Sequence, residues 1–199
     1  MHLDALLGGQ ELYGGVIPKI GKQFIQVVSI EGFPQESYPG MLSALTDLDM
    51  EYRWSSRFIF LDRHTANAHM KAYERKWRQK QHGVIDALLR TGKEPNADAV
   101  AMTNDSAAAI ADVQGGLVGG GYYTSVVILM HEDRGQLEAA ALKLQKAIFS
   151  LGFAARIETL NTLDAWMGSI PGHGVENVRR PIMNTLNLAH LLPVSSIWT

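Results

Sequence analysis

The chain has 199 residues, of which 46% are hydrophobic and 19% are charged, and its formal net charge is -2. This balance is typical of a soluble globular protein of one domain, and it excludes a chain whose whole surface attracts nucleic acid. The sequence has no cysteine, which excludes disulfides, thiolate nucleophiles and cysteine–zinc sites and is compatible with a cytoplasmic protein.

The first part of the chain predicts strands around a short helix. Residues 1–21 are rich in glycine and predict an irregular lead-in. Residues 23–30 are apolar with β-branched side chains and predict a strand, and residues 39–48 carry leucine and methionine at helical spacing and predict a short helix. Residues 50–61 place aromatic side chains on one alternating face, which indicates a half-buried strand, with Arg53 and Arg57 on the other face.

A helical insertion is predicted over residues 62–114. Asp62 is a candidate N-cap for a long polar helix that reaches about Arg90, and Asn96 can cap a second, alanine-rich helix. The glycine and proline of residues 91–95 separate the two. Together they are expected to form a helical hairpin.

The second part of the chain repeats the order of strand, helix and strand. Residues 122–130 are a continuous apolar run, typical of a strand at the centre of a sheet, and residues 133–151 predict a helix that Gly152 ends. Residues 153–158 predict a short strand, and residues 160–167 a short helix. The predicted fold is α+β: a mixed sheet of about four strands in two strand-helix-strand units, the ferredoxin-like split arrangement, in a single domain over residues 1–199.

A loop is predicted next. Residues 168–174 contain three glycines, a serine and a proline, which cannot continue a helix. Residues 178–190 then carry apolar side chains or histidine at four-residue spacing, which predicts a helix with Asn177 as N-cap and Pro193 at its end.

The sequence contains no phosphate-binding P-loop, G-x-x-x-x-G-K-[ST]. Gly21-Lys22 and Gly92-Lys93 are followed by Gln23 and Glu94 where a hydroxyl side chain is needed. Residues 119–121 are three glycines without a lysine behind them, and we interpret them as a turn and close-packing device.

No metal site is predicted. His64 and His69 are five residues apart and lack the i, i+4 spacing of zinc proteases, so we expect solvated side chains. The sequence His131-Glu132-Asp133 lies between a strand and a helix, where helix capping is the plainer role.

Five segments, in order along the chain, are similar to those of a known protein family. They are GGVIPKIG at 14–21, EYRWSSRF at 51–58, RKWRQK at 75–80, GYYT at 121–124, and AWMGSIPGHGVENVRRP with NTLNLAHLLP over 165–193. Over nearly its whole length the chain resembles the TrbE/CagE/VirB family of conjugation and type IV secretion traffic ATPases, and its TrbE branch most closely. The resemblance implies a large two-part protein whose site for ATP and Mg lies C-terminal to Thr199, so that this chain is part of the N-terminal region and has no cofactor or catalytic residue of its own.

The resemblance also implies a role. We expect a non-catalytic assembly and coupling domain, which contacts the ATPase domain of the same protein, other secretion subunits and inner-membrane components, and which is oligomeric in the full-length protein. Residues 168–199 would connect it to the motor domain. We expect it at the cytoplasmic face of the bacterial inner membrane, held there by partners, because the sequence has no apolar run of the ~20 residues that cross a bilayer and no signal peptide.

Two groups of residues are candidate contact sites. Arg179 and Arg180 follow a loop with free amides at the start of the predicted helix, and with Asn177, Gly172 and His173 they are expected to contact the motor or an acidic partner. The second group lies on the predicted insertion helix and could follow a nucleic-acid backbone or an acidic partner; it comprises Lys71, Arg75, Lys76, Trp77, Arg78 and Lys80. We favour a solvated helix face for it, with a nucleic-acid-binding module as the alternative function.

A free-standing hydrolase is the weaker alternative. Ser169 and His173 flank the glycine loop, and Asp164 is close in sequence, which is the residue set of a hydrolytic triad. No strand–turn–helix elbow surrounds the serine, however, so the triad is not favoured.

Overall fold

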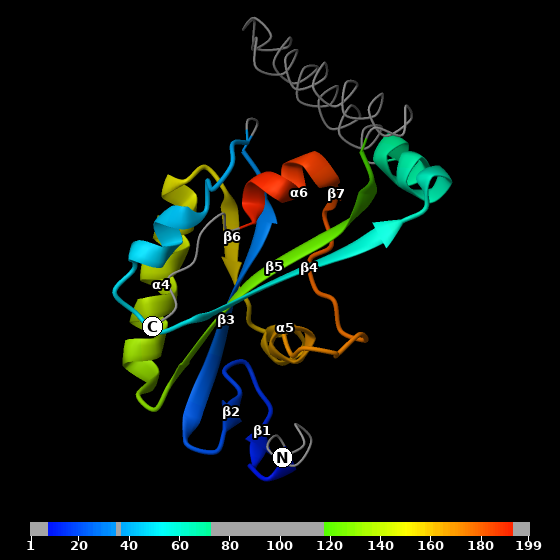
Figure 1. Ribbon diagram of the computed structural model, residues 1–199. Helices are drawn as coiled ribbons and strands as arrows, with labels where there is room; N and C mark the ends of the chain where they lie inside the picture. The colour runs from blue at the N-terminus through cyan, green and yellow to red at the C-terminus, as the bar shows by residue number, and fades with distance from the viewer. Residues whose placement is uncertain (1–7, 35–36, 73–117, 193–199) are drawn as a thin grey trace, which may run out of the picture. The chain divides into compact units, whose positions relative to one another are not determined.

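A computed structural model of the chain describes residues 8–34, 37–72 and 118–192 (Figure 1). These residues fall into two compact units. The first comprises the described residues up to 58, residues 123–181 and residues 191–192; the second comprises residues 59–72, 118–122 and 182–190. That residues 1–199 fold as a single domain stays a prediction.

Seven strands of the described residues form one β-sheet. Five of them follow one another in the order β1-β2-β3-β5-β4, while β6 pairs with β3 and β7 pairs with β5. Every pair whose register the structure gives is antiparallel. The strands are β1 (Leu12–Tyr13), β2 (Lys19–Ile20), β3 (Gln23–Gly32), β4 (Arg53–Leu61), β5 (Gly120–His131), β6 (Ala154–Ile157) and β7 (Ile182–Asn184).

The predicted α+β class is confirmed, but the sheet has seven strands where the sequence predicted about four. The additional strands β1, β2 and β7 have two or three residues each, too few to show an alternating pattern in the sequence. Two of them, β1 and β2, lie within residues 1–21, for which the sequence predicted only an irregular lead-in.

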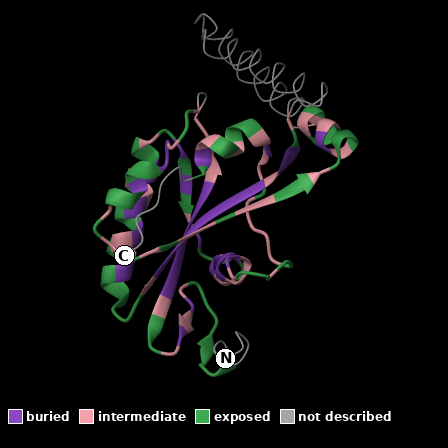
Figure 2. Cartoon of the chain, in the orientation of Figure 1, coloured by how far each residue is buried: buried purple, intermediate pink, exposed green. Residues whose placement is uncertain are grey.

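In the first unit, the sheet is buried on both faces (Figure 2). Ile25 and Val27 of β3 pack with Trp166 of helix α5 (Thr162–Gly168) in one apolar cluster. Because side chains alternate along a strand, Val28 and Ile30 point to the other face, where helix α4 (Arg134–Ser150) contacts β3 and β6 (Figure 1). The two central strands, β3 and β5, are therefore apolar on both faces, as predicted.

Local signals at the ends of α4 are confirmed. The carboxylate of Asp133 accepts a hydrogen bond from the amide of Gln136 at 2.8 Å, which is an N-cap. Gly152 follows the helix with a φ of 83°, a conformation in which glycine has no steric penalty.

Two predicted helices differ from the structure. The one predicted over residues 39–48 is a shorter 3-10 helix, η1 (Ser43–Asp47), with Leu45 buried. The one predicted from Val178 is wrong over its first turns: residues 178–181 are irregular, β7 follows, and only α6 (Thr185–Leu191) is helical. Pro181 disfavours a helical residue before it, and its carbonyl oxygen accepts a hydrogen bond from the amide of Tyr123 in β5.

In the second unit, residues 63–72 form a helix whose start is capped by Asp62, which accepts a hydrogen bond from the Thr65 amide at 2.9 Å. A Cβ at Gly120 would lie 2.8 Å from the Cβ of Ala66, so the glycines at 119–121 allow close packing, as predicted. They lie at and in β5 and not in a turn. The rest of the predicted insertion, from residue 73 to 114, lies outside the described residues.

Among the described helices, none has the length and apolar composition that crossing a membrane requires.

Candidate functional site

The predicted contact residues Gly172, His173, Asn177, Arg179 and Arg180 all lie in one segment of the first unit. This segment, residues 169–181, runs from the end of α5 to the start of β7 without regular secondary structure, and we call it the strap. Its side chains and carbonyl oxygens meet residues of β4, β5 and the end of β6.

Arg57 of β4 binds the strap through backbone carbonyl groups. Its Nη1 donates to the carbonyl oxygen of Glu176 at 2.8 Å, and its Nη2 donates to those of Gly168, at 2.5 Å, and of His173. Because the donor is charged, these hydrogen bonds are stronger than neutral ones. Gly168 is also the last residue of α5, so the guanidinium lies at the negative end of the helix dipole.

Gly168 allows the strap to approach the end of α5. A Cβ at this position would lie 2.6 Å from the carbonyl oxygen of Glu176, a distance that real Cβ atoms do not adopt. Since the obstructing atom belongs to the backbone, any larger side chain would displace the strap. The glycine predicted to end a helix therefore has a second role in close packing.

Arg53 lies four residues before Arg57 and on the same face of β4, because strand side chains alternate. Its Nη2 donates to the hydroxyl of Ser169 at 2.6 Å, and that hydroxyl donates to the carbonyl oxygen of Trp166 at 2.5 Å. Burial lowers the pKa of the Arg53 guanidinium from its ordinary value, although arginine stays charged near neutral pH.

The same contacts bear on the proposed hydrolytic triad. The buried hydroxyl of Ser169 is bonded to Arg53 and Trp166, and the imidazole of His173 is bonded to the carboxylate of Glu176. Within the described residues, Ser169 has no hydrogen bond to His173 or to Asp164. The arrangement stabilises a chain segment and does not present an activated serine.

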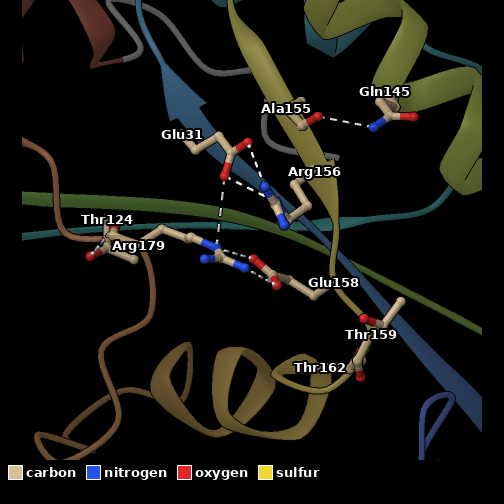
Figure 3. A network of polar contacts seen from close by, with 9 residues as sticks. All are labelled: Glu31, Thr124, Gln145, Ala155, Arg156, Glu158, Thr159, Thr162 and Arg179. Atoms are coloured by element: carbon tan, nitrogen blue, oxygen red, sulfur yellow. Dashed lines mark hydrogen bonds and ion pairs between the residues drawn. The ribbon is translucent and has the colours of Figure 1, made fainter. Parts of the chain in front are cut away.

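Arg179 forms an ion pair with Glu158, which follows β6 and is 1% exposed (Figure 3). Two hydrogen bonds join them, from Nε to Oε1 at 2.8 Å and from Nη2 to Oε2 at 2.9 Å. The hydrogen bonds with Glu158 raise the pKa of Arg179. Glu31, which also pairs with Arg156, lies 3.9 Å from Nε of Arg179.

The backbone of Arg179 has a φ of 52°, in the left-handed region that non-glycine residues rarely adopt. The predicted anion site at Arg179 and Arg180 depended on a helix N-terminus, and no helix begins there. The Arg179 side chain is instead paired inside the unit, while Arg180 is exposed. Asn177 also faces inward, since its Oδ1 accepts a hydrogen bond from Thr124 of β5 at 2.5 Å.

A small hollow lies under the strap, with a volume of about 230 Å³ that includes space open to solvent. Strands β4 and β5, helix α5 and the strap all contribute to it. It is lined by Ser55, Arg57, Thr124, Val126, Asp164, Ala165, Gly168, Glu176, Asn177 and Val178. No group of three histidine, aspartate or glutamate residues that could hold a metal ion occurs in the stretches of chain that the structure describes.

Most of the second predicted group lies elsewhere. Lys71 is exposed on the helix of residues 63–72 in the second unit. His64 and His69 of this helix are exposed, and His69 is bonded to the hydroxyl of Tyr122. The remaining members, Arg75, Lys76, Trp77, Arg78 and Lys80, lie outside the described residues.

Sequence reasoning missed the residues that hold the strap in place. The signal for Arg53 and Arg57 was their position as charged residues within a half-buried strand. Glu158 provided no such signal, because an acidic residue at the end of a predicted strand is ordinary.

Comparison with known proteins gives one family. The sequence profile of the CagE, TrbE, VirB family, described as a component of the type IV transporter system, matches residues 9–179. Across 100% of its length the chain is 42% identical to a probable conjugal transfer protein TrbE of Sinorhizobium fredii (strain NBRC 101917 / NGR234), and 42% identical to a conjugal transfer protein TrbE of Rhizobium radiobacter. It spans only 30% and 24% of these relatives.

Proposed function

The chain belongs to the CagE/TrbE/VirB family of type IV transporter components, and from this membership we propose that it is a non-catalytic assembly and coupling part of a conjugal-transfer apparatus. The observation that carries the proposal is the 42% identity to conjugal transfer proteins over the whole chain, in a region that makes up less than a third of each of them. The remainder of such a protein would then hold the site for ATP and Mg, since these 199 residues contain no P-loop.

The contacts of the strap support a structural and not a chemical role. Arg53, Arg57 and Arg179 all bind groups of their own unit, and the serine hydroxyl is bonded to Arg53 and to a helix carbonyl oxygen. Charged side chains that bind one another and the backbone stabilise a surface. They are not arranged around a position that a reacting atom could occupy.

The outward side of the strap is the proposed contact surface. Val175 is 82% exposed, Gly172 and Arg180 are exposed, and His173 is half-buried. We assign contact with the motor domain or an acidic partner to this side, through Arg180 above all. Arg179 and Asn177 keep the strap in place beneath it.

The finer fold assignment belongs to this proposal. Strands β3, β4, β5 and β6 occur along the chain as one strand-helix-strand unit with η1 and a second with α4, and they lie in the order β6-β3-β5-β4 in the sheet. We propose that these four are a ferredoxin-like core, to which β1, β2 and β7 are added. The place of action would be the cytoplasmic face of the inner membrane, with other secretion subunits as partners.

The test is conjugal transfer by the full-length protein that carries Arg180→Ala. We expect a fall in transfer frequency at unchanged protein level and unchanged ATP turnover, because the substitution removes a partner contact and no catalytic group. Lys143→Ala, on the exposed face of α4, is the matched control and should transfer normally. Normal transfer by the Arg180 variant would overturn the assigned contact, and ATP hydrolysis by the purified 199-residue chain would overturn the non-catalytic role.

A further inference from the structure

We propose that the strap is a releasable element that opens and closes over α5 and β5 while the sheet stays folded, with Arg57 as its latch. This goes beyond the proposed coupling role, because it concerns a movement within the first unit and holds whatever partner the chain has. Three observations carry the proposal.

The first observation is the kind of contact that holds the strap. Among the described residues, only Ile170 and Val178 of the strap pack against the apolar cluster under it, and both are partly buried. The other attachments are polar and come mainly from Arg57, Thr124 and Glu158. Segments with few buried apolar contacts open at lower free energy than the core, so the strap can open without the sheet.

The second observation is incomplete packing beneath the strap. The hollow of about 230 Å³ is lined by Glu176 and Asn177 on the strap and by Val126 and Ala165 beneath it, whereas protein cores have few voids larger than a water molecule. The Nδ2 of Asn177 is buried without a hydrogen-bond partner in the described structure. Opening would therefore break few van der Waals contacts and would hydrate one unsatisfied polar group.

The third observation is the convergence of contacts on one side chain. The carbonyl oxygens of Gly168, His173 and Glu176 span most of the strap, and a single guanidinium binds all three. Loss of that guanidinium would release these points together. The far end stays fixed, because Arg179 is paired with Glu158 and the Pro181 carbonyl oxygen is bonded to the Tyr123 amide.

Thiol labelling can measure the opening, because the chain has no cysteine of its own. Ala165→Cys places the probe under the strap, at a position that lines the hollow and is 2% exposed. Ala141→Cys on the inner face of α4, where Ala141 is 0% exposed, reports unfolding of the sheet. Val175→Cys, at the exposed tip, gives the rate for a free thiol.

We expect the thiol at position 165 to react with a maleimide faster than the thiol at position 141, and at a rate that low denaturant concentrations do not change. Arg57→Gln should raise the labelling rate at position 165 roughly tenfold and leave the rate at position 141 unchanged. Arg134→Gln, which removes an exposed ion pair on α4, should change neither rate. Equal rates at the two positions, with the same dependence on denaturant, would overturn the proposal.

A second variant keeps the proposal testable if Arg57→Gln does not fold. Gly168→Ala retains the arginine but places a Cβ 2.6 Å from the Glu176 carbonyl oxygen, so the strap cannot close fully. We expect the same increase in labelling at position 165, with labelling at position 141 unchanged. An unchanged rate at position 165 in this variant would contradict the latch.

Discussion

The carboxylate of Glu158 and the guanidinium of Arg179 form two hydrogen bonds, at 2.8 and 2.9 Å, although Glu158 is only 1% exposed. A carboxylate this deeply buried is stable only when it is paired. Arg179 adopts a left-handed backbone conformation at this point, and such residues persist where the surrounding structure fixes them. The pair therefore explains both the buried charge and the unusual backbone.

Replacing Arg179 with alanine should destabilise the protein strongly. The substitution leaves the Glu158 carboxylate buried without its partner, and we expect the free energy of unfolding to fall by about 3 kcal/mol. Urea denaturation followed by circular dichroism measures this. Arg134→Ala removes the exposed pair with Glu138 and should cost less than about 1 kcal/mol. Equal losses in the two variants would show that the buried pair contributes nothing special.

Replacing Gly120 with alanine tests the close packing in the second unit. The added Cβ would lie 2.8 Å from the Cβ of Ala66, so strand and helix must shift, and we expect a loss of about 1–3 kcal/mol in urea denaturation. Gly14→Ala is the control, because nothing lies within 4 Å of a Cβ there. A neutral Gly120 variant would refute the packing role.

The capping of the 63–72 helix should depend on pH in the acid range. Hydrogen bonds from Thr65 hold the pKa of Asp62 below its ordinary value of about 4. A group with a lowered pKa in the folded state stabilises it fully above the ordinary pKa and loses that contribution as the pH falls through the lowered one. We therefore expect the amide resonance of Thr65 to titrate below about pH 4.

Asp62→Asn provides the control for this titration. Asparagine can also cap a helix but carries no titrating group, so the pH dependence at Thr65 should disappear while the helix remains. A midpoint at or above the ordinary aspartate pKa in the unsubstituted protein would contradict the cap.

Replacing Ser169 with alanine separates a structural serine from a nucleophile. Because its hydroxyl joins Arg53 to the end of α5, we expect a loss of about 1–2 kcal/mol in stability. The unsubstituted protein should not react with a fluorophosphonate probe. Ser150→Ala, where an exposed hydroxyl donates to the Ala147 carbonyl oxygen, should cost less. Covalent labelling at Ser169 would reinstate the hydrolase alternative.

The sequence predicted those features whose causes are local. Asp62 and Asp133 cap helices through amides three residues away, and Gly152 ends α4 by its own backbone conformation. The predicted helix from Val178 was wrong because a distant partner decides the outcome: the carbonyl oxygen of Pro181 bonds to the Tyr123 amide in β5. A four-residue spacing cannot reveal that competition.

The candidate site shows the same division. The residues of the strap were recognised as a group because they are adjacent in the sequence, but their roles were not. Arg57 and its carbonyl partners are more than a hundred residues apart along the chain, as are Arg53 and Ser169. The sequence places both arginines on a strand and carries no sign of what they bind.

Arg57 recognises the strap through the polypeptide backbone, which every residue possesses in the same form. Its hydrogen bonds go to the carbonyl oxygens of His173 and Glu176 and not to their side chains, so the fold imposes no identity on these residues through this contact. Gly168 is different, since it must stay small. Homologous proteins could thus vary the outer surface of this segment to suit different neighbours while keeping one arginine, and a lysine would be a poor substitute because its single ammonium cannot span three separated acceptors.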